Sequence, residues 1–275
     1  MEFDSEKEFL KNYNPNNYDR LSMTTDILLF SVSDILQDNY RKTNEKAMSI
    51  LMVKRSNYPF KDKWCLPGGF LKVKEELEDC PKRILAEETN LHNIYMEQLY
   101  TFGSVKRDPR MRIVSTAYMA LIDKNTLKEN IKEKAEWFDI SYKEKSGTIT
   151  LVLKSISEEI IIKAKKILVE STTGRYKYEI IENTKIAFDH ADVILTGIER
   201  LRNKVEYTDI VFNMMPKQFT LGELQKVYEV ILGKKLLMPA FRRIIANKVK
   251  KTEQIKTGEG HRPSAMFTYS HKKSN

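Results

Sequence analysis

Cysteine is scarce in this sequence, which contains only Cys65 and Cys80. The two lack the spacing of metal ligands and no secretion signal accompanies them, so we expect neither a cysteine metal site nor a disulfide. Long hydrophobic runs are missing as well. The longest apolar stretches, such as Ile27 to Val32, have the length of a strand, which excludes a membrane-spanning helix. The acidic N-terminus has no signal-peptide core. These absences predict a protein of the reducing cytoplasm with no membrane partner.

What is present is typical of a globular protein: 41% of the residues are hydrophobic and 31% are charged. The length of 275 residues is enough for two domains with separate cores. The net charge of +9 is unevenly distributed. From Glu199 onward, 16 lysines and arginines stand against seven acidic residues, so the whole excess lies in this last part. A neutral body with a basic end indicates a polyanionic partner for that end.

One stretch combines a tight turn with an acidic helix. Leu66 to Leu71 contains a Pro-Gly-Gly turn, which needs the conformational freedom of glycine. Arg83 to Leu91 is expected to be helical, with Arg83 and Glu87 on one face. Glu88, the next residue, lies on the adjacent face of the same helix. Adjacent carboxylates after such a turn can hold a hard cation and, through it, a diphosphate. The same glutamates are also compatible with an ordinary solvated helix face.

The spacing of this stretch resembles the Nudix box. The matching positions are Gly69, Glu75, Arg83, Leu85, Glu87, Glu88 and Leu91. The resemblance implies that Glu87 and Glu88 are the candidate catalytic residues. It also implies that these two, with Glu75 in support, form a weak Mg²⁺ site, and that Gly69 lies beside the ligand.

Two positions depart from the Nudix pattern. Asn90 replaces the glycine that ends the helix, a mild change because Asn tolerates the left-handed conformation. Ile84 replaces a glutamate that is a principal metal ligand in active family members, and isoleucine cannot coordinate Mg²⁺. We therefore expect the Nudix fold to be kept and favour a protein that is not an enzyme.

Around the box, apolar segments of strand length predict several β-strands. Strands are expected at Met23 to Val32, Ala47 to Val53, Tyr95 to Phe102 and Val114 to Ile122. Residues 149–181 begin as a strand and continue either as a hairpin or as a short helix; the pattern does not separate the two. Lys185 to Leu201 shows a helical recurrence of apolar residues that closes this domain.

A loop between two expected strands carries Arg107, Asp108 and Arg110. The planar guanidinium group suits phosphate because it forms two parallel hydrogen bonds, so these residues are candidates for ligand contact. The alternative is a plain surface loop. The loop resembles a segment of superfamily members that handle ADP-ribose, and residues 188–190 (Phe-Asp-His) resemble another. For Asp189 we prefer the interpretation that it is the N-cap of the closing helix.

The basic end contains two expected helices. Thr220 and Glu223 have the spacing of a capping box at the start of the first helix, and Gly233 ends it. The second is expected at Met238 to Lys251. Its apolar stripe, which should face the first helix, is Phe241, Ile244, Ile245 and Val249. Its outer side is left with Arg242, Arg243, Asn247 and Lys250.

A glycine-rich hairpin follows, with Arg262 near its tip. The order of helix, turn, basic helix and hairpin is that of a winged helix-turn-helix domain. We predict that Arg242, Arg243, Asn247 and Lys250 enter the DNA major groove and that Arg262 contacts the backbone. An ordinary solvated basic face is the alternative for such a helix alone.

A degenerate Nudix box joined to a winged helix resembles the Nudix-related transcriptional regulator family. The resemblance implies an α+β protein: a Nudix α/β/α sandwich with a mixed sheet in residues 1–200, then a small winged helix-turn-helix domain in residues 201–275. It implies a ligand-responsive regulator that binds operator DNA as a homodimer. Its Nudix domain would sense ADP-ribose or a related nucleotide or sugar phosphate.

Two other functions remain open on the sequence. One is an active, MutT-like Nudix pyrophosphohydrolase acting on ADP-ribose or another nucleoside diphosphate derivative, with Mg²⁺ at Glu87 and Glu88 and another acid such as Glu144 in place of the missing ligand. The other is a module that binds RNA or a protein partner through the basic end.

Overall fold

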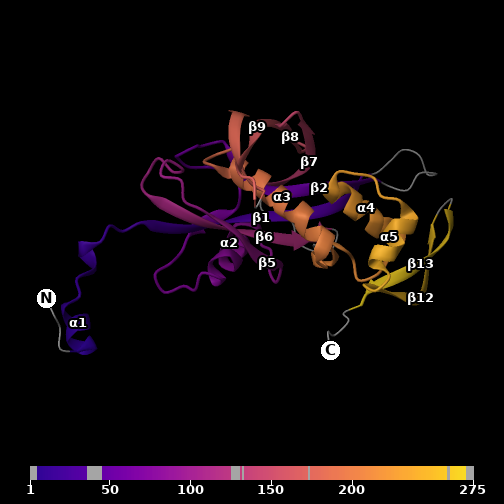
Figure 1. Ribbon diagram of the computed structural model, residues 1–275, viewed down its shortest axis with the longest axis horizontal. Helices are drawn as coiled ribbons and strands as arrows, with labels where there is room; N and C mark the ends of the chain where they lie inside the picture. The colour runs from indigo at the N-terminus through magenta and orange to yellow at the C-terminus, as the bar shows by residue number, and fades with distance from the viewer. Residues whose placement is uncertain are drawn as a thin grey trace.

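The computed structural model describes residues 5–35, 45–124, 131, 133–172, 174–258 and 261–270. The molecule is elongated, with helix α1 (Glu6–Asn12) and a short 3₁₀ helix (Pro15–Asn17) at one end and a small C-terminal domain at the other (Figure 1). Among these described residues, none of the helices combines the length and the hydropathy needed to cross a membrane.

A large mixed sheet forms the body. Its strands are β1 (Ser22–Ile35), β2 (Glu45–Lys54), β3 (Trp64–Cys65), β4 (Gly68–Phe70), β5 (Tyr95–Phe102), β6 (Ile113–Ile122), β7 (Ala135–Lys145), β8 (Thr148–Lys154), β9 (Glu159–Glu170) and β10 (Arg175–Asn183). Their order is β10-β9-β8-β7-β2-β1-β6-β5, with β3 and β4 paired to β2 and β1. β1 runs antiparallel to β2 and parallel to β6, which confirms the predicted mixed sheet. Within residues 149–181, β8 is followed by β9 and β10 as antiparallel strands, so of the two alternatives the hairpin is confirmed.

Helices cover both faces of the sheet. α2 (Asp79–Thr89) lies on one face and α3 (His190–Tyr207) on the other. Successive side chains of a strand point to opposite faces, so in β1 Ile27 and Leu29 pack toward α2 while Leu28 and Phe30 pack toward α3. A Cβ at Gly197 would come within 1.8 Å of Leu28, so glycine lets α3 approach β1 closely. This is the predicted α/β/α sandwich.

The C-terminal domain has the predicted winged helix order. Its elements are η3 (Ile210–Met214), β11 (Phe219–Thr220), α4 (Leu221–Leu232), α5 (Met238–Ile245), β12 (Val249–Gly258) and β13 (His261–Tyr269). β11, β13 and β12 form a second sheet in that order. The capping box of Thr220 and Glu223 is present, and Gly233 ends α4 with a φ of 67°.

The second helix is shorter than predicted. It ends at Ile245 rather than near Lys251, and the residues from Val249 onward form β12. The reason is pairing along the chain's last strand: Val249 lies opposite Tyr269 and Lys250 opposite Thr268. Tertiary pairing therefore overrides the helical pattern that the sequence suggested.

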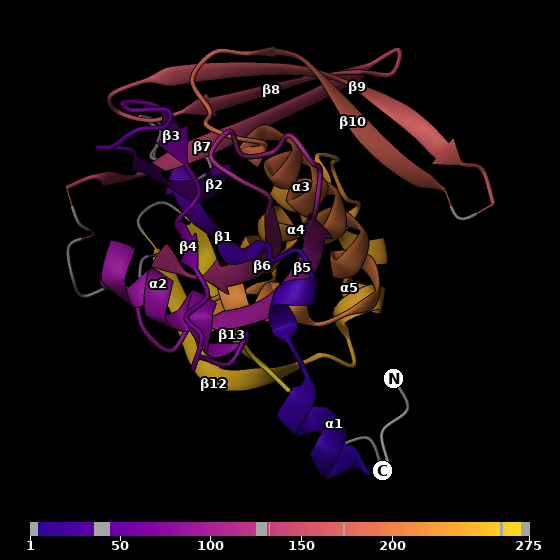
Figure 2. The same ribbon diagram turned by 90° about the vertical axis from the view of Figure 1, so that its left-hand side faces the viewer.

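The two parts of the chain share one hydrophobic core. Leu201 and Val205 of α3 belong to the same cluster of buried residues as Leu224 and Ile231 of α4, and that cluster continues into the large sheet. Figure 2 shows β8 to β10 lying across α3, with α4 and α5 on its far side. The winged helix is thus docked on the sandwich through both α3 and β2, against which α4 packs.

Candidate ligand pocket and DNA-reading surface

A cavity of about 330 Å³ opens where the turn between β3 and β4 meets β1 and the loop after β5. Gly69, Glu88, Arg107, Asp108 and Arg110 all line it. The fold therefore brings together predicted residues that are distant in the sequence. The volume falls within the range of pockets that hold small organic ligands.

Two of the box glutamates are engaged by Arg83. The Arg83 Nε donates to Glu75 Oε1 at 2.6 Å, and its Nη1 donates to Glu87 Oε2 at 2.9 Å. The hydrogen bond from Arg83 outweighs the opposing effect of burial and lowers the pKa of Glu75 to about 2. Glu75, which precedes α2, and Glu87 on α2 are therefore both paired with Arg83, and neither lines the cavity.

Ile84 lies where the Nudix pattern has a metal-binding glutamate. Its side chain is 2% exposed and packs with Ile27, Leu29 and Leu85 between α2 and the sheet. A Cβ at Gly69 would come within 3.2 Å of the Ile84 Cδ1, so the turn rests directly on this side chain. The apolar replacement is accommodated as part of the core.

The Mg²⁺ site predicted at Glu75, Glu87 and Glu88 is not assembled. Over the described part of the chain, no three His, Cys, Asp or Glu side chains are grouped so that they could share an ion. The physical reason is the donor set: Arg83 occupies two of the glutamates, Ile84 supplies no oxygen, and Glu88 alone of the three lines the cavity. The residues present do not fit a Nudix metal centre. Asn90 does end α2 in the left-handed conformation, with a φ of 64°, as expected.

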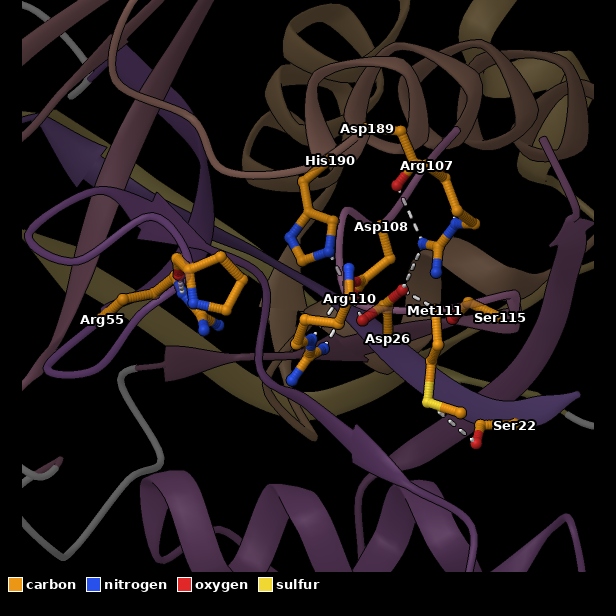
Figure 3. A network of polar contacts seen from close by, with 11 residues as sticks. Ser22, Asp26, Arg55, Arg107, Asp108, Arg110, Met111, Ser115, Asp189 and His190 are labelled. Atoms are coloured by element: carbon orange, nitrogen blue, oxygen red, sulfur yellow. Dashed lines mark hydrogen bonds and ion pairs between the residues drawn. The ribbon is translucent and has the colours of Figure 1, made fainter. Parts of the chain in front are cut away.

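Arg107 is placed differently from the prediction that it is presented to a ligand. Its side chain is 4% exposed, and Nε and Nη2 each donate to a carboxylate oxygen of Asp189 at 2.8 Å. Nη2 also donates to Asp26 Oδ2 at 3.2 Å. The guanidinium therefore joins the loop after β5 to β1 and to the start of α3 (Figure 3).

Asp189 was expected to cap α3 with its side chain, and that interpretation is wrong. It occupies the N-cap position but makes no side-chain cap hydrogen bond. Its carboxylate instead accepts both hydrogen bonds from Arg107, because a fixed guanidinium fork offers a stronger, charge-assisted partner than a backbone N–H.

Asp26 was not predicted from the sequence, and His190 was noted only as part of the segment 188–190, without a role. The backbone N–H of Leu66 donates to His190 Nδ1 at 2.9 Å, and His190 Nε2 lies 3.5 Å from Asp26 Oδ1. Ser115 donates to Asp26 Oδ2 at 2.6 Å. Burial raises the pKa of Asp26, but His190, Ser115 and Arg107 outweigh it and lower the pKa to about 2. A carboxylate at the head of the apolar run that begins with Ile27 was the available signal.

Of the two predicted arginines, Arg110 is the one that lines the cavity with an exposed side chain. Its side chain is 41% exposed and is held in place by Asp108, which accepts from Nε at 3.0 Å and from Nη2 at 2.8 Å. The guanidinium carbon lies 5.4 Å from the ring centre of Phe70 and 5.7 Å from that of Phe188. A cation positioned between two rings is oriented without being neutralised on every side.

The cavity lining carries more positive than negative charge. Lys54, Arg55 and Lys134 contribute cations in addition to Arg107 and Arg110, while the acids are Asp26, Glu88 and Asp108. Since Asp26 and Asp108 are already paired with the two arginines, the three added cations leave the lining with an excess of positive charge. This lining favours an anionic ligand.

The basic face of the winged helix is turned to solvent. Arg242 and Arg243 on α5, Asn247 after it and Lys250 on β12 are all exposed. Ile244 is 55% exposed, so its predicted place in the stripe facing α4 is wrong; α5 is buried through Phe241 and Ile245.

The predicted wing is present as the hairpin of β12 and β13. Residues 259 and 260 at its tip lie outside the described residues, as does the side chain of Arg262, whose backbone belongs to β13. The predicted DNA contact of Arg262 stays a prediction.

Comparison with known proteins identifies both parts of the chain. A NUDIX domain model matches residues 39–144, and a model of the NrtR DNA-binding winged helix domain matches residues 211–269. The ADPR responsive transcriptional repressor NtrR of Acinetobacter baylyi is 33% identical over 275 residues, covering 98% of this chain and 90% of the repressor.

Two solved structures are similar over nearly the whole chain. A MutT/nudix family protein from Enterococcus faecalis has a TM-score of 0.70 at 25% identity, covering 97% of this chain and 94% of that protein. NrtR of Shewanella oneidensis, complexed with a 27mer DNA, has a TM-score of 0.63 at 28% identity, covering 90% and 93%. The similarity therefore includes the way in which the two domains follow one another.

Proposed function

Because this chain belongs to the family of Nudix-related transcriptional regulators, we propose that it is a DNA-binding regulator of transcription that responds to ADP-ribose or a closely related nucleotide. Residues 1–200 bind the ligand and residues 201–275 bind operator DNA, with α3 running through the boundary. The observation that carries the proposal is the identity to an ADPR responsive repressor along both domains.

The ligand part of the proposal is supported by the charge of the cavity. We assign Arg110 to the diphosphate, because its guanidinium is oriented by Asp108 and reaches the cavity. Lys54, Arg55 and Lys134 supply further positive charge around the anion. Arg107 acts mainly by holding the walls of the cavity together. Gly69 gives the ligand access to the backbone of the turn.

Nudix domains generally use a divalent metal ion, and the pyrophosphohydrolase alternative would require one, Mg²⁺ in the sequence-based prediction. The donors of this chain do not fit such a centre, as described above, so we propose that ligand binding proceeds through the cationic side chains. Hydrolysis of ADP-ribose, with Glu87 and Glu88 as catalytic residues, is correspondingly absent or feeble. Release of AMP from ADP-ribose in Mg²⁺, abolished by Glu88→Gln, would instead support the enzyme.

The DNA part of the proposal is supported by the solvent-facing cations of α5. Arg242 and Arg243 lie on the helix that enters the major groove in winged helix-turn-helix domains, and Asn247 and Lys250 follow it in the chain. We propose a cytoplasmic homodimer, since two copies of such a domain match the two half-sites of an operator.

The test uses a duplex selected by the full-length protein from a random DNA library. We expect its dissociation constant, measured by fluorescence anisotropy, to change at least fivefold when ADP-ribose is added. Arg243→Met should weaken binding of the duplex, and Arg110→Met should weaken the response to ADP-ribose. If no duplex is selected over random DNA at moderate salt, where purely electrostatic binding fades, the proposal is wrong.

A further inference from the structure

Helix α3 reaches both functional parts of the molecule. Its first residue, His190, lines the ligand cavity, and its second half packs on α4 of the winged helix. An α-helix of 18 residues is about 27 Å long, so these contacts lie near opposite ends of one rigid element. A displacement at the start of α3 is therefore transmitted along this helix to the winged helix domain.

Arg202 forms the joint at the far end. Its Nε donates to the main-chain carbonyl of Ile231 at 3.0 Å, and its guanidinium carbon lies 4.0 Å from the ring centre of Tyr142 on β7. The Ile231 carbonyl is in the last turn of α4, where helix carbonyls lack intrahelical partners and the helix dipole favours a cation. One side chain of α3 thus contacts both the large sheet and the end of α4.

The surroundings of Arg202 are built for close approach. A Cβ at Gly233, which ends α4, would lie 3.2 Å from Arg202 Nη2, so glycine leaves room for the guanidinium. Nearby, Glu199 of α3 accepts hydrogen bonds from Tyr178 of β10 and from Lys166 of β9, the latter at 2.7 Å. These bonds fasten α3 to the strands of the sheet beside the joint.

The near end of α3 is fastened by the pair of Arg107 and Asp189. Asp189 immediately precedes α3, and both of its carboxylate oxygens accept from Arg107 at 2.8 Å. Arg107 lines the cavity, so an anion bound there attracts its guanidinium and repels the Asp189 carboxylate. Ligand binding thereby changes the electrostatic interactions of the residue that immediately precedes α3.

We propose that Arg202 is a positioning residue that couples the two sites by fixing the end of α4 to α3. Through this contact, ligand binding in the cavity determines the orientation of the winged helix relative to the Nudix domain. This inference rests on the proposed function and names the residue that carries its regulation. The ligand must then bind more tightly to the conformation with one orientation of α4 than to the other. A ligand shifts a conformational equilibrium only by the difference between its affinities for the two conformations.

The experiment compares Arg202→Met with the wild-type protein and with Arg200→Met, a matched control that removes an exposed arginine from the same helix. The probes are ADP-ribose and the selected duplex. Three constants are measured for each protein: for ADP-ribose alone, for DNA alone, and for DNA with saturating ADP-ribose. Coupling is the ratio of the two DNA constants.

We expect Arg202→Met to bring the coupling ratio to within twofold of one, while the dissociation constant for ADP-ribose alone changes less than threefold. Arg200→Met should keep the wild-type ratio. A wild-type ratio in the Arg202→Met protein overturns the inference, whereas a ratio of one in the wild-type protein overturns the proposed function instead.

A second variant keeps the test decisive if Arg202→Met does not fold. Tyr142→Leu leaves the arginine in place but removes the ring against which it lies. It should reduce the ratio at least threefold, and Tyr142→Phe, which keeps the ring, should restore it. Equal ratios in the Leu and Phe variants contradict the assigned role of Arg202.

Discussion

Replacing Arg107 by Met should destabilise the protein by about 3 kcal/mol near pH 7. The change removes a guanidinium that is 4% exposed and leaves the Asp26 and Asp189 carboxylates, 8% and 19% exposed, without it. Removing one partner of a buried ion pair typically costs about 3–5 kcal/mol. We expect the lower end because Asp26 keeps its hydrogen bond from Ser115 and because Asp189 is partly solvated.

The same substitution should change how stability depends on pH. In the folded wild-type protein the pKa of Asp26 is about 2, below its ordinary value of 3.8. Its stabilisation is therefore present above about pH 4 and is lost as the pH falls toward 2. Without Arg107 the folded-state pKa of Asp26 rises, so the free energy of unfolding of the variant falls less on acidification than that of the wild type. The difference between variant and wild type should shrink as the pH is lowered from about 7 to about 3.

Urea unfolding followed by tryptophan fluorescence measures both effects, since Trp64 is buried in the core. Arg112→Met is the matched control, because Arg112 is an exposed arginine of the same loop that donates to the Ser104 carbonyl. Its cost should stay below about 0.5 kcal/mol. A loss below about 1 kcal/mol in Arg107→Met, or a loss that does not vary with pH, would refute the structural role given to this residue.

Three further predictions follow from single contacts. Burial and the charge of Asp189 raise the pKa of Asp192 from 3.8 to about 6, so its ionised form disfavours the fold as pH rises through that interval; Asp192→Asn should add about 1–3 kcal/mol near pH 7 and nothing near pH 3 in urea titrations. Thr220→Ala removes the side-chain oxygen that accepts from the Glu223 N–H and should cost about 1 kcal/mol in thermal unfolding, while Thr220→Ser should cost less. Arg243→Met should weaken DNA binding and make the negative slope of log K against log salt shallower by about one.

The local features of the fold were predictable because they follow from short-range rules. The Pro-Gly-Gly turn, the capping box at Thr220 and Glu223 and the apolar run of β1 each depend on residues a few positions apart. The same is true of the loss of a metal ligand at Ile84, which a spacing pattern shows directly.

The interior of the pocket was less predictable because it is set by long-range register. Arg107 meets Asp26 and Asp189 only because β1 pairs with β6 in parallel and α3 begins beside the turn at Leu66. Nothing near Arg107 in the sequence marks it as a buried partner of two carboxylates. The arginine-bearing loop does line the cavity, but its sequence did not indicate which of its two arginines is buried and which is exposed.

The extent of α5 was mispredicted for a related reason. Residues 246–251 continue the apolar and basic helical pattern, yet Val249 and Lys250 pair with β13, which lies later in the chain. Periodicity uses only residues close together in the sequence, so it does not detect a pairing strand that lies further along the chain.

The central claim is that the Nudix cavity and the winged helix are energetically coupled. Calorimetric titration of ADP-ribose into the free protein and into the protein saturated with the selected duplex tests it directly. The account predicts that DNA changes the affinity for ADP-ribose by the same factor by which ADP-ribose changes the affinity for DNA. Equal affinities for ADP-ribose in the two titrations would contradict it.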